Sequence, residues 1–403
     1  MVLESGYEKL GTVFPMKPLG GSVEKKPTMI RGQFFTRETE VLTPSGWVSV
    51  ADLGDSMLMQ VNQNLEGEFI KPLEYETRSY HGDLVRYERK LHKMLASPDT
   101  EIVFTEGSRL LKQRLQDMPN SINGLIPTAI TYKWGTGTGF TEDQLSLIVA
   151  VMADGNITNR KTMVFDGEKY IPNRYITFNF KKVRKVNRLL GVLDALGIPC
   201  SYNEHSNGVY SIYFTAPTWL LGKTFPVSWI TDMTLEERQF FISEVVQWDG
   251  NPSKAGHEEF YSQFYDECSF VQIIAETCGM HASICEQKKT KGTMFTTNIF
   301  PDRDCVSWTD SHSNMEYEKY TGDVSCLRVP SGNLLIRYMG KITVVGDCSD
   351  MVLQKSQLQR DRNDMARWIS TEDPLEFDML EALAIMDCRA MLDSNNIFKR
   401  KNL

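Results

Sequence analysis

The sequence predicts an α+β protein in which an all-β unit is interrupted by an α/β unit containing two repeats, with a C-terminal helical segment behind it. Three observations lead to this fold class. Residues 145–155 and 240–250 are near-copies of one helical stretch, LSLIVAVMADG and FFISEVVQWDG. Short strand-like segments precede the repeats and return after them, and residues beyond 348 show helical spacing of apolar side chains. Strands on both sides of a mixed segment are the pattern expected of an insertion.

These patterns divide the chain into five expected segments. They are an extended N-terminal arm over 1–33, two halves of the β unit at 34–132 and 301–347, the two-repeat unit at 133–300, and the helical segment at 348–403. The arm has little periodicity and holds no domain of its own. The C-terminal helices are too small to bury much surface alone, so we expect the arm and these helices to offer a surface to a protein partner.

Composition narrows the class of protein. The 403 residues are 41% hydrophobic and 24% charged, which is typical of a soluble protein of two or more domains. No apolar run reaches the length of a membrane span and no signal peptide opens the chain, so we expect a cytoplasmic protein without a membrane partner. The eight cysteines form no C-x-x-C pair, which predicts reduced thiols.

Each copy of the repeat carries signals for both ends of a helix. Thr141 is followed three residues later by Gln144, and Thr234 by Glu237, which are capping boxes. Each copy ends in Asp-Gly, and we expect the glycine to leave the helix through a positive φ. Both stretches are apolar over most of their circumference, so both helices should be buried on several sides and pack against each other.

This packing would bring Asp154 and Asp249, which end the two copies, side by side. Two neighbouring carboxylates repel and raise each other's pKa unless a cation lies between them. Hard oxygen ligands suit Mg²⁺, for which Mn²⁺ can substitute, and metals held in this way serve phosphoryl chemistry. The alternative is that two buried helices end in solvated Asp-Gly turns.

The paired stretches resemble the LAGLIDADG, or DOD-type, homing endonucleases in their single-chain, two-repeat form. The resemblance implies cleavage of double-stranded DNA, with Asp154 and Asp249 as catalytic metal ligands. Residues 223–226, Lys-Thr-Phe-Pro, are similar to a block whose lysine helps to activate water or to stabilise developing charge. The resemblance therefore gives Lys223 a catalytic role, and a plain surface lysine is the alternative.

A cluster of basic residues predicts contact with DNA. All five members lie in the helix expected over 181–196: Lys181, Lys182, Arg184, Lys185 and Arg188. Neutralisation of phosphates drives most nucleic-acid affinity, and the net charge of −8 argues against it for the chain as a whole. A charge run is also often only a solvated face, so that alternative stays open.

The strand-rich segments resemble the Hint fold of inteins over roughly residues 34–347. Splicing needs a nucleophile as first residue, a Thr-x-x-His pair, a penultimate His in most cases, a terminal Asn, and then Cys, Ser or Thr. Only Cys348 matches this pattern, as the following nucleophile. The other positions depart from it: Phe34 for the first nucleophile, Ser97 and Thr100 for the Thr-x-x-His pair, Gly346 for the penultimate His, and Asp347 for the terminal Asn.

One route around these departures uses a cysteine of the penultimate block as the nucleophile. Cys326 falls at about that place, although the route still requires the imidazole that Thr100 replaces. The alternative for Cys326 is a small buried strand residue. We therefore expect a degenerate, splicing-inactive module that is retained as a β scaffold.

The leading functional hypothesis is a metal-dependent, site-specific DNA endonuclease carried in this degenerate intein. The rival belongs to another class, because a chain that does not splice keeps its flanks attached. It would then be an unspliced structural or interaction protein, for example a phage-particle component, located in the virion.

Overall fold

The computed structural model describes residues 33–348 except 108, 119–121, 123, 166–169, 221, 253–255, 290–291 and 309–313. The N-terminal arm up to residue 32 and the C-terminal helices expected after Cys348 lie outside the described residues. The described chain is a mixed α/β protein, mostly sheet, with five α-helices. Across these described ranges, no helix has both the length and the apolar character that a membrane span requires.

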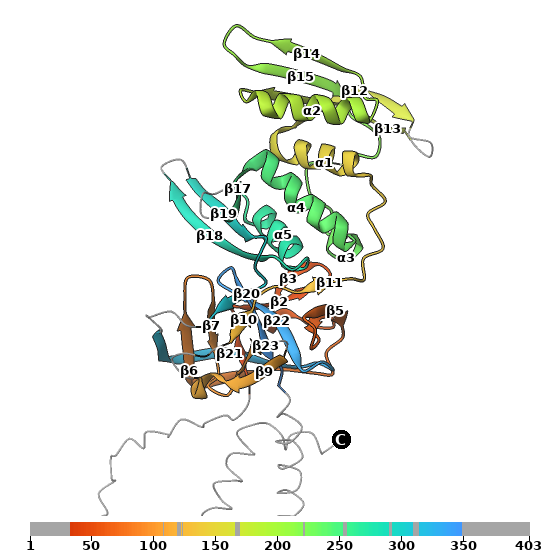
Figure 1. Ribbon diagram of the computed structural model, residues 1–403. Coiled ribbons are helices and arrows are strands. Elements are labelled where there is room, and N and C mark those ends of the chain that lie inside the picture. Colours follow the sequence, from red (N-terminus) through yellow and green to blue (C-terminus); the bar gives the residue numbers. More distant parts are fainter. Residues whose placement is uncertain are drawn as a thin grey trace, which may run out of the picture. The chain divides into compact units, whose positions relative to one another are not determined.

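One group of strands lies at the two ends of the described chain (Figure 1). Strands before residue 133 pair with strands after residue 300, so the two segments share their sheets. A closed barrel has the order β1-β21-β6-β7, and an eleven-stranded sheet contains the path β11-β5-β4-β22-β23-β8-β10-β20. Strands β2 and β3 join this sheet through β22, and β9 joins it through β8. The strand bounds are β1 Phe35–Thr36, β2 Thr39–Thr43, β3 Gly46–Ser49, β4 Leu58–Val61, β5 Glu66–Ile70, β6 Glu74–Glu88, β7 Lys93–Ala96, β8 Glu101–Glu106, β9 Arg109–Arg114, β10 Leu125–Pro127, β11 Thr131–Tyr132, β20 Cys305–Ser307, β21 Asn314–Arg328, β22 Asn333–Tyr338 and β23 Lys341–Gly346.

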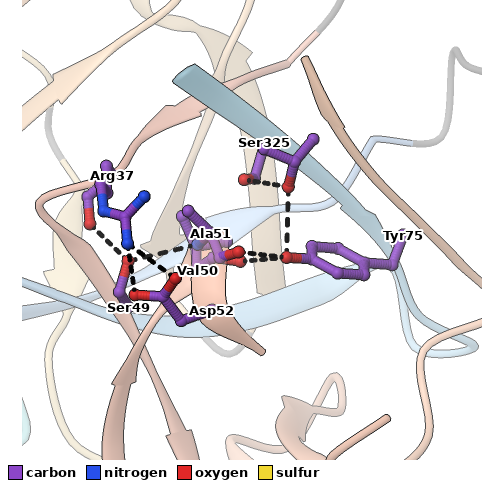
Figure 2. A network of polar contacts seen from close by, with 8 residues as sticks. Arg37, Ser49, Val50, Ala51, Asp52, Tyr75 and Ser325 are labelled. Atoms are coloured by element: carbon purple, nitrogen blue, oxygen red, sulfur yellow. Dashed lines mark hydrogen bonds and ion pairs between the residues drawn. The ribbon is translucent and has the colours of Figure 1, made fainter. Parts of the chain in front are cut away.

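A hydrogen-bond network links Ser325 of β21 through β6 to the short 3-10 helix after β3 (Figure 2). The Tyr75 hydroxyl lies 2.9 Å from two backbone carbonyl oxygens of the short 3-10 helix Val50–Asp52. Thr77 links Tyr75 to Ser325, with hydroxyl separations of 3.1 and 2.8 Å. These contacts hold the strand segment that carries Cys326, the residue after Ser325, against the 3-10 helix that follows β3.

The middle of the chain contains the two repeats, and each has its own four-stranded sheet. The sheet orders are β12-β13-β15-β14 and β16-β17-β19-β18, which is the same arrangement twice. The elements of the first repeat are α1 Glu142–Asp154, β12 Asn156–Phe165, β13 Tyr170–Phe180, α2 Val183–Ala195, β14 Cys200–Glu204 and β15 Tyr210–Thr215. Those of the second are α3 Trp229–Asp232, α4 Leu235–Asp249, β16 Gly250–Pro252, β17 Glu258–Ser262, α5 Tyr265–Glu276, β18 His281–Lys289 and β19 Gly292–Phe300.

Both repeat helices begin at their predicted capping boxes. The Thr141 hydroxyl accepts a 3.3 Å hydrogen bond from the Gln144 N–H, and the Gln144 side chain accepts one of 2.9 Å from the Thr141 N–H. Thr234 and Glu237 repeat this exchange at 3.2 and 2.9 Å. The residues from Leu145 to Met152 are all buried, as expected for a helix covered on several sides.

The predicted reason for the terminal glycines is wrong. Gly155 has a φ of −73° and Gly250 a φ of −112°, so neither adopts the left-handed conformation. A Cβ on Gly155 would lie 2.8 Å from the Val151 Cα, and one on Gly250 would lie 2.5 Å from the Val246 Cα. The chain passes directly from helix into strand at both places, and the close approach of the preceding turn, rather than φ, excludes a side chain.

Candidate functional site

Helices α1 and α4 lie side by side, and each ends on the aspartate of its repeat (Figure 1). Lys185, the third residue of α2, reaches both carboxylates. Its Nζ forms an ion pair with Asp154 Oδ2 and lies 3.4 Å from Asp249 Oδ1. The structure therefore brings Asp154 and Asp249 to one ammonium group.

The two carboxylates are partly exposed, whereas the Lys185 side chain that pairs with both is mostly buried. The exposed fractions of the side chains are 28% for Asp154, 31% for Asp249 and 10% for Lys185. Burial raises the pKa of Asp249, and the negative charge of Asp154 raises it further, whereas Lys185 acts in the opposite direction. This is the electrostatic situation of two carboxylates that need a cation.

A cavity of about 750 Å³ opens beside the pair. Its charged and polar lining includes Lys182, Arg184, Lys185, Asp249, Glu258 and Tyr261. Burial raises the pKa of the Glu258 carboxyl. The volume and the converging charges at one wall are those expected of a ligand-binding site.

Glu267 is a member of the site that sequence reasoning missed. It lines a second, small pocket together with Asp249, and its carboxylate accepts a 2.5 Å hydrogen bond from the Ser262 hydroxyl. Glu267 is the third residue of α5, as Lys185 is the third residue of α2. Alignment of the repeats beyond their first helices would have found both positions.

The predicted basic cluster divides into two groups. Lys181 and Lys182 are exposed, as a DNA-contacting surface requires. The other three contact α4 or the carboxylates: Arg184 donates to the Gln247 carbonyl oxygen, Arg188 pairs with the buried Glu244, and Lys185 lies at Asp154 and Asp249. The helix therefore uses much of its charge for internal contacts, because α2 packs its basic side against the ends of α1 and α4.

Lys223, to which the resemblance gave a catalytic role, lies apart from the ion pairs of the two aspartates. It is exposed in the loop before α3, and no ion pair joins it to a carboxylate in the described part of the chain. Lys185 is the lysine that pairs with both aspartates. The signal for Lys185 was present in the sequence only as one member of a charge run, which does not show which lysine turns inward.

The donor set fits a hard divalent cation in part. Asp154 and Asp249 supply carboxylate oxygens that already share a cation, and Mg²⁺ commonly takes one or two carboxylates and leaves other positions to water and phosphate. Within the described ranges, no group of three His, Cys, Asp or Glu side chains completes a closed metal cage. An open site of this kind suits a metal that is shared with a phosphate ligand.

A second constellation surrounds the peptide bond between Gln33 and Phe34. The Phe34 N–H donates a 3.0 Å hydrogen bond to the Ser97 hydroxyl, which lies 3.0 Å from the Thr100 hydroxyl. The Cys348 Sγ lies 2.7 Å from the carbonyl oxygen of Gln33. The two ends of the β unit therefore meet at this peptide.

Cys326 and Cys348 are joined by a disulfide, so the prediction of reduced thiols is wrong for this pair. The two Cα atoms are 5.9 Å apart, a spacing that permits the bond, and it arises because Cys348 lies beside the end of β21. The remaining described cysteines are not bonded to one another: Cys200, Cys268, Cys278, Cys285 and Cys305.

Glu101 lies beside Gly346, the position at which splicing sequences usually have a histidine. A Cβ on Gly346 would lie 2.7 Å from Glu101 Oε2, so the Glu101 side chain fills the space of the expected histidine. Lys112 lies 3.4 Å from the same carboxylate. Burial raises the pKa of Asp347, whose Oδ2 accepts a 2.8 Å hydrogen bond from the Val329 N–H.

No protein-family model matches the chain. A curated relative, the ribonucleoside-diphosphate reductase subunit beta of Aquifex aeolicus (strain VF5), is 25% identical over 399 residues. That match covers 86% of this chain and 55% of the relative. The chain therefore spans about half the length of the curated relative it matches.

Among solved structures, a splice-inactive, GSH-linked variant of the AceL NrdHF class 3 split intein aligns with 78% of this chain and 97% of its own, at a TM-score of 0.32 and 7% identity. I-DmoI in complex with DNA and Mn aligns with 39% of this chain and 89% of its own, at a TM-score of 0.31 and 12% identity. The N-terminal LAGLIDADG domain of DUF199/WhiA covers 40% and 77%, at a TM-score of 0.28 and 13% identity. These TM-scores are low, so the functional proposals rest on side-chain geometry.

Proposed function

We propose that the chain is a site-specific double-strand DNA endonuclease that hydrolyses phosphodiester bonds with a divalent metal ion. The observation that carries this proposal is the convergence of Asp154 and Asp249, from two copies of one helix, on a single cation. A duplicated carboxylate suits a substrate with two scissile phosphates. Each aspartate would serve one of them.

Asp154 and Asp249 would hold Mg²⁺, or Mn²⁺ in its place, through their carboxylate oxygens. When bound, the metal supplies Lewis-acid stabilisation of the phosphate and a more acidic bound water. Lys185 keeps the two carboxylates together before the metal arrives, and it presents positive charge at the wall of the cavity. In this proposal Lys185, rather than Lys223, is the lysine of the carboxylate site, and its ammonium group occupies the site before the metal does.

The DNA would contact the exposed faces of the two four-stranded sheets. Strand β14 is exposed at all five positions, and the tyrosines Tyr202 and Tyr213 are exposed on adjacent strands. A strand pair of this kind can enter the major groove and read base edges. Lys181 and Lys182 would contact phosphates, which position the duplex without reading its sequence.

The test is Mg²⁺-dependent cleavage of DNA that spans the chain's own gene with the coding region for residues 34–347 removed. We expect a paired double-strand cut. Asp154→Asn and Asp249→Asn should each lower its rate by at least about 100-fold, the effect of removing one group that stabilises transition-state charge. Asp194→Asn, an exposed aspartate on α2, is the matched control and should leave the rate unchanged. An intact, folded chain that cuts neither this DNA nor a randomised library would overturn the proposal.

A second candidate activity is acyl transfer at the peptide bond between Gln33 and Phe34. The observation that favours it is the Cys348 Sγ, 2.7 Å from the Gln33 carbonyl oxygen, with the Phe34 N–H held by Ser97. Hydrogen bonding to Phe34 N positions the group that must leave when a thiol attacks the carbonyl carbon. The two thiols of Cys326 and Cys348 would be the nucleophiles.

Complete splicing would join residues 1–33 to residues 348–403 and release residues 34–347. The curated relative suggests that the joined flanks would belong to a ribonucleoside-diphosphate reductase subunit beta. Mass spectrometry of the purified chain tests this directly, because the ligated flanks and the intact chain differ greatly in mass. The rival hypothesis of an unspliced structural protein requires the intact chain alone, without DNA cleavage.

A further inference from the structure

The Cys326–Cys348 disulfide lies beside the Gln33–Phe34 peptide bond, where the two sulfur atoms would be the nucleophiles of acyl transfer. Cys348 Sγ is 2.7 Å from the Gln33 carbonyl oxygen, and it is bonded to Cys326 Sγ. Both cysteines are buried, with about 1% of their surface exposed. A sulfur in a disulfide carries neither a proton nor a negative charge, so it cannot act as the attacking thiolate.

The backbone around the pair is fixed independently of the disulfide. Cys348 N–H donates a 2.8 Å hydrogen bond to the Leu327 carbonyl oxygen, next to Cys326 in β21. The Asp347 N–H donates to the Gly332 carbonyl oxygen at 2.9 Å. Reduction of the disulfide would therefore leave the Cys348 thiol beside the Gln33 carbonyl group, since backbone hydrogen bonds hold Cys348 in place without the S–S bond.

We propose that this disulfide is a redox lock on acyl transfer at Gln33–Phe34: the oxidised chain withholds both sulfur nucleophiles, and reduction releases them. The inference rests on the acyl transfer proposed above and adds its control by thiol–disulfide chemistry. The reductant is a small thiol or a phosphine.

The chemistry balances in two steps. Two molecules of a small thiol give two electrons and two protons, the Cys326–Cys348 bond breaks into two thiols, and the reductant leaves as its own disulfide. One cysteine sulfur then attacks the Gln33 carbonyl carbon. A C–S bond forms, the C–N bond to Phe34 breaks, and the proton lost by the thiol ends on the Phe34 amine. The product is a thioester of residues 1–33 on that cysteine.

The experiment uses the full chain, purified without reductant, with its disulfide content measured by mass after alkylation of free thiols. Hydroxylamine cleaves any thioester and releases the peptide of residues 1–33 as its hydroxamate. A phosphine is the reductant, because it reduces the disulfide with oxygen from water and is not itself a thiol that would attack a thioester. We expect release to be at least about tenfold faster with the phosphine than without it, since only the reduced chain has a thiolate.

Single cysteine variants distinguish inhibition by the disulfide from the acyl transfer itself. Cys348→Ala frees Cys326, and Cys326→Ala frees Cys348, so at least one of them should release the peptide without any reductant. The double variant should release none in either condition. Cys200→Ser removes an exposed cysteine that is outside the disulfide, and it should keep the reductant dependence of the unaltered chain. Circular dichroism melts show whether each variant is folded.

The outcomes are distinct. Equal release with and without phosphine, while the disulfide is intact, would overturn the lock and leave acyl transfer standing. No release from any folded variant in either condition would overturn acyl transfer, and the lock with it. Release from the double variant would show that the cysteines are not the nucleophiles. None of these outcomes affects the endonuclease proposal, which is tested on DNA.

Discussion

The carboxylate pair and the Gln33–Phe34 peptide are built in opposite ways. Asp154 and Asp249 end two helices at an open cavity, and an ammonium group lies between them. The peptide is enclosed by buried hydroxyl groups and sulfur atoms. The first site is open to solvent, whereas the residues around the second are buried. The difference teaches that one chain can combine an open, charged cavity with a buried peptide bond that is surrounded by the chain's own side chains.

The largest effect on stability should come from the polar support of the carboxylate site. Glu244 is fully buried, pairs with Arg188 and accepts a 2.7 Å hydrogen bond from the Trp248 indole N–H. Glu244→Ala should lower the free energy of unfolding by about 3 kcal/mol, since it leaves the buried Trp248 indole N–H and the partly exposed Arg188 guanidinium without an acceptor. Urea unfolding measures this. Glu236→Ala, exposed in the first turn of α4, should change it by less than about 1 kcal/mol. An equal loss of unfolding free energy in Glu244→Ala and Glu236→Ala would mean that the buried carboxylate contributes no more stability than an exposed one.

The stability of the β unit should depend on pH, because it buries the neutral imidazole of His92. Burial lowers the pKa of His92 to about 3, so the folded state keeps its imidazole neutral, while the unfolded chain binds a proton below its usual pKa of 6.5. The stability from His92 is therefore complete above pH 6.5 and is lost as the pH falls from 6.5 toward 3. Each pH unit in that range costs about 1.4 kcal/mol.

His92→Phe removes this titration and should raise the free energy of unfolding at pH 5, relative to pH 8, by about 2 kcal/mol compared with the unaltered chain. The phenyl ring can keep the contacts of the imidazole with Tyr87 and Trp308. His205→Phe is the control at an exposed histidine. The same pH dependence in both variants would contradict the burial argument.

The junction should reject the histidine that splicing sequences usually carry. Gly346→His should destabilise the chain by about 1–3 kcal/mol, because its Cβ would lie 2.7 Å from Glu101 Oε2. Thermal unfolding measures the loss. In a Glu101→Gly background, which removes both the Cβ and the Oε2 of Glu101 that lie 2.7 Å from the added Cβ, the same substitution should cost less. An equal cost in both backgrounds would show that Glu101 is not what excludes a side chain at residue 346.

The smallest predicted effect concerns the cation of the carboxylate site. Lys185→Met removes the ammonium that a divalent ion must replace, so the dissociation constant for Mn²⁺ should fall about tenfold, or about 1.4 kcal/mol. Calorimetric titration of Mn²⁺ measures this without DNA. Lys182→Met, at an exposed lysine of the same cavity, is the matched control. Weaker binding by Lys185→Met than by the control would mean that Lys185 supports the metal rather than competes with it.

Local sequence signals account for much of the repeat unit. Thr141 and Thr234 begin their helices because the capping atoms lie within four residues of each other, and such short-range geometry can be read directly from the sequence. The apolar faces that bury α1 and α4 were equally visible. For β6 and β21 the sequence predicted only that strands occur in these parts of the chain. No local rule gives the register between residues 74–88 and 314–328.

The sequence by itself determined the elements, the repeat and the types of reactive residue. The tertiary structure alone decided which of them meet. Lys185 rather than Lys223 lies at the carboxylates because α2 packs against the ends of both repeat helices, and Cys326 meets Cys348 because the end of the β unit pairs with β21. Helix caps and periodicity are short-range properties of the chain. Contacts between residues far apart depend on packing and strand register, which are settled only when the whole chain has folded.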